Sequence, residues 1–534
     1  MRGRGRYYQP PVISPEATQE YFDRIRKDYE FLKQVPEKEL RAELYALGFR
    51  FVTEPRHAQL VCLTIATYEP GWLFLLPPGA GKSKIIIDLI RWHHKQGRVK
   101  RALILAPELM HVYSWEEQLA THGPDLKTVT LLGNSSKRQQ LLKKDFVVGV
   151  MNYKGLETYM TSLKPDPKKK QRKKRVIDAD LAAEFALCFQ MVGFDESHRL
   201  GNHKSLLFHM GVWLREACDF VYGATGTAFR RDPSMLWSQF YLMDGGQTLC
   251  DTLGKFRALF FTAKQHYFKG VEYEFKEELR NDLSRVIRNK SIYYDDKELN
   301  KSLPPKIFLR KPVVLSAEAR DYFDRIVKKL KEERGDYTTL KNPYVRMRQV
   351  SSGYLSLKAD DDSRIQVRFK ENVKLDALKQ LVIEQREGDK YLIYYEFRPS
   401  GDWICEMLED QKIGFSRLSG GMKDIEGEYQ RFLKQDKRLA FVINNALGSE
   451  AINPQYVCHR EIFYETPDDP IQRTQAERRI WRDGQKYTSF ITDIYARGTL
   501  DAKLLRYNQE GRNLLQAIMR GDETLAGEEE DEDV

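Results

Sequence analysis

A loop with two glycines, a lysine and a serine separates two apolar segments near the start of the chain. Its residues are Gly79, Ala80, Gly81, Lys82 and Ser83. Glycine lets backbone N–H groups turn toward an anion, and a helix N-terminus adds partial positive charge. A lysine at this place can reach the phosphates of a nucleotide, and a serine hydroxyl can ligate Mg²⁺. The pattern predicts a strand over 72–76, a phosphate-binding loop, and a helix that Gly97 ends.

The loop departs from the consensus GxxxxGK[ST], because Leu76 stands where the first glycine is expected. Two interpretations therefore stay open at this point. The loop either binds phosphate, or is a plain turn that happens to contain Gly-Lys-Ser. The strand–loop–helix setting favours phosphate binding.

A second candidate site follows the apolar run 186–194, which ends at Asp195 and Glu196. A carboxylate at the end of a strand beside a phosphate loop can hold Mg²⁺ opposite the loop hydroxyl, which is the role we expect for Asp195. Glu196 could then polarise the attacking water. A solvated Asp-Glu turn is the alternative. A third apolar run leads into Thr225 and Thr227, whose hydroxyls could sense the nucleotide.

Length and composition limit the class of protein. With 534 residues the chain exceeds one core, and we expect two to four domains. Its formal net charge of +10 suits a polyanionic partner. No apolar run reaches about 18 residues, so we expect no membrane span. The basic N-terminus lacks the apolar segment of a signal peptide, so we expect a soluble intracellular protein.

Buried strands alternate with amphipathic helices along most of the chain, which predicts an α/β fold with parallel doubly wound sheets in two lobes. The expected divisions are an N-terminal extension (1–45), a first lobe (46–245), a helical segment packed on it (246–302), a second lobe (303–510), and a helix end with an acidic disordered tail (511–534).

A basic run, Lys168–Arg175, carries seven lysines and arginines and should lie on a surface insertion. Three interpretations stay open for it. It could bind nucleic-acid phosphates, act as a nuclear import signal, or be a solvated loop.

Motifs in a fixed order extend the pattern over nearly the whole chain. They are EPRHAQLVCL (54–63), the phosphate loop, LILAPELMHVYSWEEQL (103–119), VVGVMNYKGL (147–156), DESH (195–198), ATGTAFRR (224–231), YLIYYEFRPSGDWICEML (391–408), FVINNALGSEAINPQ (441–455) and QRTQAERRIWRDGQK (472–486). In this order the chain resembles the Snf-type, superfamily-two helicase-like ATPases. Its single-unit build is similar to the phage and bacterial branch of that family.

The resemblance implies two tandem RecA-like lobes with ATP and Mg²⁺ in the cleft between them. It implies that Gln59 reads adenine, that Gln475 belongs to the nucleotide site, and that Arg479 and Arg482 neutralise charge on the transferred phosphate. Three motif positions depart from the family. Ser449 and Ala451 stand where glycines are usual, and Trp481 stands where histidine is usual. A solvated basic helix is the alternative for the two arginines, which would share one helix face if their segment is helical.

The function implied is an ATP-dependent motor on double-stranded DNA, acting as a monomer with an unidentified loading, replication or repair partner. We expect the protein in a bacterial or host cytoplasm, or in a nucleus if the basic run is an import signal. Two alternatives remain: a helicase on RNA or branched DNA, and a non-catalytic DNA-binding scaffold with a vestigial nucleotide site.

Overall fold

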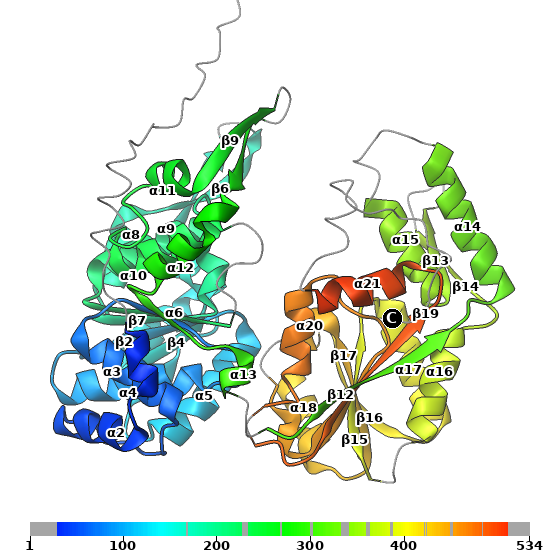
Figure 1. Cartoon of the computed structure of the whole chain (residues 1–534), viewed down its shortest axis with the longest axis horizontal. Helices are drawn as coiled ribbons and strands as arrows, with labels where there is room; N and C mark the ends of the chain where they lie inside the picture. Colours follow the sequence, from blue (N-terminus) through cyan, green and yellow to red (C-terminus); the bar gives the residue numbers. More distant parts are fainter. Residues whose placement is uncertain are drawn as a thin grey trace, which may run out of the picture. The chain divides into compact units, whose positions relative to one another are not determined.

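The structure, a computed structural model, describes residues 29–166, 169–226, 233–266, 270–299, 303–332, 341–358, 364–384, 388–420, 422, 424–448, 452–482 and 484–510. Several positions singled out above lie outside these residues: Thr227, Ser449, Ala451, the acidic tail, most of the N-terminal extension, and the side chains of 168–172. The chain divides into two compact units, Met1–Lys301 and Ser302–Val534, each built on its own sheet (Figure 1). None of the described helices is long and apolar enough to cross a membrane.

The first unit is built on a seven-stranded parallel sheet. Its strands pair in the order β11-β1-β8-β7-β2-β4-β3. In chain order they are β1 (Trp72–Leu75), β2 (Ala102–Ala106), β3 (Thr128–Thr130), β4 (Val148–Asn152), β7 (Met191–Asp195), β8 (Phe220–Thr225) and β11 (Ser291–Tyr293). The central strands are almost wholly apolar, which is typical of parallel strands covered on both faces.

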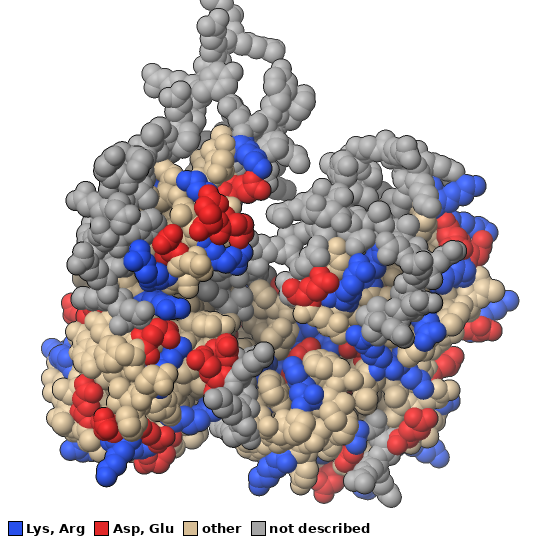
Figure 2. Space-filling view, viewed as in Figure 1, with Lys and Arg blue, Asp and Glu red and all other residues tan. Residues whose placement is uncertain are grey.

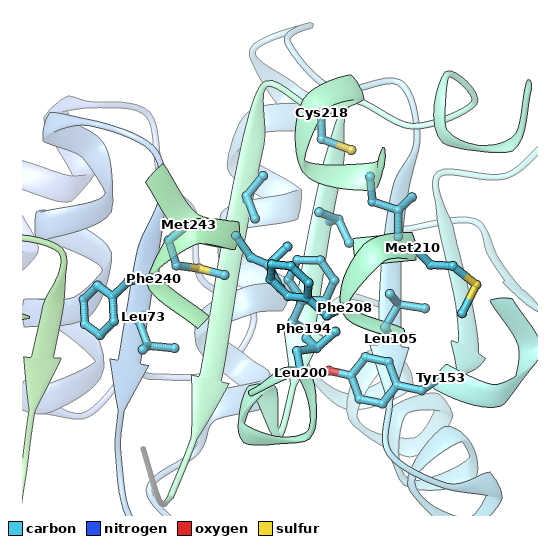
Figure 3. Packing of buried hydrophobic residues seen from close by; sticks show 14 of the residues in the cluster. Leu73, Leu105, Tyr153, Phe194, Leu200, Phe208, Met210, Cys218, Phe240 and Met243 are labelled. Atoms are coloured by element: carbon cyan, nitrogen blue, oxygen red, sulfur yellow. The ribbon is translucent and has the colours of Figure 1, made fainter. Parts of the chain in front are cut away.

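Alternate strand residues enter two separate cores. On one face Trp72 and Phe74 pack with helices α2 (Glu37–Ala46), α3 (His57–Tyr68), α4 (Lys82–Lys95) and α5 (Leu109–His122). On the other, Leu73 and Phe194 pack with α7 (Leu156–Met160), α8 (Ala179–Ala186), α9 (Leu206–Ala217), α10 (Ser234–Asp244), α11 (Leu253–Phe260) and α12 (Arg280–Ile287), as Figure 3 shows in part. Shorter elements complete the unit: η1 (Glu30–Gln34), α6 (Ser135–Leu142), η2 (Tyr153–Gly155), η3 (Ser197–Leu200), η4 (Glu277–Leu279) and α13 (Asp296–Leu299).

Segment 246–302 differs from the helical segment that the sequence predicts. Besides α11 and α12 it contains an antiparallel hairpin, β9 (Phe261–His266) with β10 (Gly270–Phe275), and the sheet strand β11. Val271, Tyr273 and Phe275 alternate with glutamates, and this period of two residues is the strand signal that was missed.

The described part of the basic run, residues 169–175, lies in a strand and not in a loop. It belongs to β6 (Lys169–Ile177), which pairs antiparallel with β5 (Thr161–Asp166). In the view of Figure 1 this hairpin and the hairpin of β9 and β10 extend from the same end of the first unit.

The second unit is built on a six-stranded parallel sheet in the order β12-β19-β18-β15-β17-β16. Its strands are β12 (Lys306–Val313), β15 (Lys390–Tyr395), β16 (Gly414–Leu418), β17 (Arg438–Asn444), β18 (Cys458–Phe463) and β19 (Ser489–Ala496). A hairpin of β13 (Tyr354–Lys358) and β14 (Arg364–Arg368) is separate from this sheet.

Helices cover both faces of the second sheet as well. Tyr391 and Ile393 pack with α16 (Val373–Ile383) and α17 (Arg398–Asp410), while Leu392 and Tyr394 pack with α18 (Ile425–Lys434) and α20 (Pro470–Glu477). The remaining elements are α14 (Ala317–Glu332), α15 (Lys341–Ser351), α19 (Asn445–Gly448), η6 (Pro454–Tyr456) and α21 (Leu500–Gln509). Each unit is thus a doubly wound parallel α/β fold, as the sequence predicted.

Candidate functional site

The glycine-rich loop lies at the carboxyl edge of the first sheet, between β1 and α4. Gly79 and Gly81 have φ of 83° and 79°, a conformation that glycine adopts without steric cost. A Cβ on Gly81 would collide with the Gln59 amide nitrogen, so a side chain there would displace Gln59 from the loop as well as strain the backbone. The loop therefore runs directly into the N-terminus of a 14-residue helix whose first residues are Lys82 and Ser83.

Gln59 lies against this loop. Its Nε2 is 3.2 Å from the carbonyl oxygen of Gly81 and 3.5 Å from that of Ala80, while its Oε1 accepts the backbone N–H of Arg56 at 2.8 Å. The Arg56 guanidinium also donates to the Gly79 carbonyl at 3.1 Å. Gln59 therefore holds the loop backbone, and its contact with adenine stays a prediction.

The acidic pair ends β7 and meets the phosphate loop. Lys82 Nζ lies 3.8 Å from Glu196 Oε1 and donates to the Leu76 carbonyl at 3.1 Å. The lysine and Asp195 are each only 9% exposed. The loop follows β1 and the acidic pair follows β7. Because these strands are parallel members of one sheet, their carboxyl ends lie at the same edge, where open α/β sheets bind ligands. The fold thus brings together residues that lie far apart in the chain.

A small hydrogen-bonded network orients the Glu196 carboxylate. The Thr225 hydroxyl, at the end of β8, donates to Glu196 Oε2 at 3.0 Å. His198 Nδ1 lies 3.2 Å from the same oxygen and 3.0 Å from Thr225 Oγ1. Glu196 itself has φ of 46°, an uncommon conformation for a residue with a side chain that occurs at functional sites.

The pKa values of the two carboxyl groups are shifted in opposite directions. Burial would raise the pKa of Glu196, but the Lys82 charge and the hydrogen bonds from His198 and Thr225 outweigh it and hold this pKa well below its usual range. Burial and the neighbouring Glu196 charge raise the pKa of Asp195. Glu196 therefore stays ionised to a lower pH than Asp195, and a cation beside Asp195 would favour the ionised form of that carboxyl group as well.

The donors at this edge fit a magnesium ion bound together with a nucleotide. Mg²⁺ prefers oxygen ligands and usually takes one or two carboxylates plus substrate phosphates. Asp195 offers a carboxylate, and Ser83, half-buried in the first turn of α4, offers a hydroxyl. Bound there, the ion would neutralise phosphate charge.

The last motif lies in the second unit, and its helix ends before the two motif arginines. α20 contains the half-buried Gln475 and ends at Glu477, so Arg479 and Arg482 do not share a helix face. Arg479 instead donates to the Ile452 carbonyl at 3.3 Å, and Arg482 donates to the Asn453 side chain. The segment after β17 thus anchors both arginines.

Buried charges hold α20 in place. Arg473, 5% exposed, donates to Asp493 Oδ2 at 2.8 Å and to Glu477 Oε1 at 2.8 Å, and its guanidinium lies 3.7 Å from the centre of the Phe463 ring. These contacts join α20 to strands β18 and β19. The sheet therefore fixes the position of the helix that Arg479 and Arg482 follow.

Three residues next to the candidate site were not assigned a role from the sequence. Trp115 and Tyr153 both hydrogen-bond to Asp195, and Asn453 accepts the Arg482 guanidinium. All three belong to motifs quoted above. Tyr153 directly follows β4, and a polar residue just after a strand end is the signal that could have found it, whereas Trp115 and Asn453 lie further along the chain from β2 and β17 and carry no such signal.

Replacing Thr225 by valine should lower catalytic turnover by roughly tenfold and leave nucleotide affinity unchanged. Valine keeps the shape but removes the hydroxyl that joins Glu196 to His198, and a misplaced catalytic group costs up to about 10²-fold. Steady-state hydrolysis and nucleotide titration measure the two quantities. The control is Thr64→Val, a buried α3 residue whose hydroxyl has no hydrogen-bond partner among the described residues. Equal turnover in both variants would contradict the role.

Comparison with known proteins places these motifs in context. The sequence model of the SNF2-related domain family matches residues 67–362, more than half of the chain. The chain is 23% identical over 453 residues to the CHD3-type chromatin-remodeling factor PICKLE of Arabidopsis thaliana, covering 81% of this chain and 31% of that protein. It is 21% identical over 449 residues to Chromodomain-helicase-DNA-binding protein 1 of Homo sapiens, covering 80% and 24%.

A shorter match, 27% identical over 141 residues, is to the DNA repair and recombination protein RAD54-like of Drosophila ananassae, covering 26% of this chain and 18% of that protein. The chain thus spans about a third or less of the length of these relatives. Among solved structures, the Sulfolobus solfataricus SWI2/SNF2 ATPase core in complex with dsDNA is 18% identical, with a TM-score of 0.39, covering 89% of this chain and 95% of that one.

Proposed function

The chain belongs to the SNF2-related domain family, and we propose that it hydrolyses ATP to ADP and phosphate while it moves along double-stranded DNA. Lys82, Ser83 and the backbone of the phosphate loop bind the phosphates and Mg²⁺. Asp195 holds the ion from the opposite side, and Glu196 orients the attacking water. Membership of the phage and bacterial branch stays a prediction.

One observation carries this proposal: the 3.8 Å approach of Lys82 Nζ to Glu196 Oε1 at the carboxyl edge of the first sheet. A lysine and a carboxylate this close, both shielded from water, form a compact site in which the lysine favours the ionised carboxylate. A plain turn or a solvated acidic pair would leave these side chains in water.

The ion pair also suggests how nucleotide binding prepares the base. Without nucleotide, Lys82 depresses the pKa of Glu196 and makes this carboxylate a weak proton acceptor. When Lys82 turns to the phosphates, that stabilising charge leaves Glu196. The carboxylate then becomes more basic, while Thr225 and His198 keep its orientation.

Arg479 and Arg482 are assigned the stabilisation of the transition state. Phosphoryl transfer spreads negative charge over the γ-phosphate oxygens, and planar guanidinium groups neutralise it well. The match of both residues to the family's last motif supports this role. The anchoring of Arg482 to Asn453 gives the guanidinium a defined position within the second unit.

The deciding experiment is ATP hydrolysis measured without nucleic acid and then with duplex DNA, single-stranded DNA or RNA. We expect duplex DNA to stimulate hydrolysis most. Lys82→Ala should abolish the activity, whereas Lys95→Ala, which removes an exposed lysine at the other end of the same helix, should not. Stronger stimulation by RNA would support the RNA helicase alternative, and wild type without hydrolysis would support the vestigial scaffold.

The hairpin of β5 and β6 is a further candidate for contact with DNA. Lys164 lies directly opposite Lys174, and Lys173 directly precedes Lys174 on the same strand; all three are exposed. Like charges opposite each other destabilise a hairpin, and a polyanion would relieve the repulsion. Figure 2 shows basic and acidic side chains interspersed over both units on the face in view, so the positive surplus is not concentrated there.

Replacing Lys164, Lys173 and Lys174 by alanine should weaken duplex DNA binding and flatten its dependence on salt. Each lost phosphate contact lowers the slope of log K against log salt by about 0.9. Fluorescence anisotropy at several salt concentrations measures this slope. Alanine at Lys38, Lys95 and Lys143 makes the same change in charge at exposed sites elsewhere. Identical slopes for the two triple variants would exclude the hairpin from the DNA path.

A further inference from the structure

Asp195 is held by two aromatic side chains that the proposed mechanism does not use. Trp115 of α5 donates its indole N–H to Asp195 Oδ2 at 2.8 Å, and Tyr153 of η2 donates its hydroxyl to the Asp195 main-chain oxygen at 2.7 Å. Trp115 is 2% exposed and Tyr153 3% exposed, so water does not compete for either bond. Asp195 therefore has one buried aromatic partner at its carboxylate and another at its main-chain oxygen.

The sheet order explains why these two residues reach the same carboxyl end. β7, which ends at Asp195, lies beside β2, and α5 follows β2 in the chain. β4 lies next to β2 on its far side, and η2 begins directly after β4. In Figure 3 the Tyr153 ring lies at one end of the buried cluster with its hydroxyl directed toward Leu200. Parallel strands thus carry both donors to the edge where β7 ends.

Among the described residues, each of the two Asp195 carboxylate oxygens accepts one hydrogen bond. Oδ2 accepts the Trp115 N–H, and Oδ1 accepts the backbone N–H of Glu196 at 3.0 Å. A carboxylate oxygen has two lone-pair sites, so each retains one for a cation. An indole can only donate, which means that Trp115 can orient the carboxylate but cannot replace it as a ligand.

We propose that Trp115 is a positioning residue that fixes the Asp195 carboxylate for Mg²⁺, and that Tyr153 supports it by fixing the backbone at the same strand end. The inference rests on the proposed function, since it assigns Asp195 to the ion. Mg²⁺ demands near-ideal octahedral geometry, so a carboxylate free to rotate binds it less well. Outer partners of metal ligands contribute about 10–100-fold in metal affinity or activity.

A buried indole needs an acceptor wherever it lies, so a purely structural role is the competing explanation. Trp92 provides the matched case: it is 6% exposed and donates its indole N–H to the Leu47 carbonyl at 2.9 Å, away from the site. Tyr222 is the matched control for Tyr153. It is fully buried, and its hydroxyl lies 3.2 Å from His93 Nε2. Phenylalanine at either control position removes a comparable polar contact.

The test measures the binding of a fluorescent ATP analogue to the full chain over a range of free Mg²⁺ concentrations, with ATP hydrolysis over the same range. Trp115→Phe should raise the Mg²⁺ concentration for half-maximal binding by roughly tenfold or more. Its affinity for the analogue without Mg²⁺ should stay within about twofold of wild type, and saturating Mg²⁺ should restore most of the turnover. Tyr153→Phe should shift the Mg²⁺ midpoint in the same direction but by less.

The controls Trp92→Phe and Tyr222→Phe should leave the Mg²⁺ midpoint unchanged. A Trp115→Phe midpoint equal to that of wild type, or a Trp92→Phe shift of the same size, would overturn the proposal. If Trp115→Phe does not fold, an unshifted midpoint in Tyr153→Phe overturns it instead. A wild-type chain whose binding does not depend on Mg²⁺ would refute the proposed function itself, so the two failures are distinguishable.

Discussion

Replacing Arg482 by alanine is expected to lower ATP hydrolysis by about 10³-fold or more, the range of an arginine that neutralises phosphoryl-transfer charge. ATP affinity should stay within a few-fold of wild type. The reason is that such a group adds little to ground-state binding and much to the transition state, where charge on the phosphate is most spread. Duplex DNA should then fail to rescue the rate.

Asn453→Ala offers a graded version of the same experiment. It leaves the guanidinium present but removes the side chain to which Arg482 donates. We expect a smaller loss of turnover than in Arg482→Ala, again with affinity for ATP retained.

Arg479→Ala should resemble Arg482→Ala with a milder effect on turnover, since Arg479 is anchored to a main-chain oxygen, that of Ile452.

Steady-state ATPase assays with and without duplex DNA, beside nucleotide binding by fluorescence, measure these effects. Arg431→Ala is the control, because Arg431 lies on α18 and pairs with Asp424 and Glu428 outside the last motif. DNA-stimulated hydrolysis near the wild-type rate in Arg482→Ala would falsify the role proposed for this arginine.

Glu196→Gln is expected to lower turnover by roughly a hundredfold or more, the range for loss of a positioned proton acceptor. ATP should still bind, because the amide keeps the size of the side chain and its contact with Thr225. The variant also loses the charge that pairs with Lys82, so the lysine is freer to meet phosphate. Affinity for ATP should therefore be equal to or higher than that of wild type.

Single-turnover hydrolysis separates this chemical step from product release. Glu184→Gln makes the same substitution at an exposed position of α8 and should leave turnover unchanged. A Glu196→Gln enzyme that cleaves ATP in the first turnover as fast as wild type would show that another group orients the water.

The sequence alone determined the elements and their type where local chemistry is strong. The apolar runs 72–76 and 186–194 predicted buried strands, which the structure forms over Trp72–Leu75 and Met191–Asp195, and Gly-Ala-Gly-Lys-Ser predicted the loop and the start of α4. The parallel doubly wound class followed from the alternation of these strands with helices. These properties depend on residues that are neighbours in the chain, and for this reason the sequence alone predicts them.

Local patterns were less decisive where a pairing partner was needed. The hairpin of β9 and β10 and the edge strand β11 lie in a segment whose charge suggested helices, and β6 lies in a run that suggested a loop. A strand is stabilised by hydrogen bonds to another strand, so its stability depends on residues distant in the sequence.

Only the tertiary structure decided which groups meet at the candidate site. The motifs predicted Lys82 and Glu196 as functional residues, but the order β1-β8-β7 in the sheet sets their 3.8 Å approach and places Thr225 at the end of the strand between them. Hydrogen bonds likewise join Asp195 to Trp115 and Tyr153, and Arg482 to Asn453. Their partners lie 29 to 80 residues apart in the chain. Hydrogen bonds of this kind depend on distance and direction in space, which the packing of strands and helices sets and the spacing of residues along the chain does not.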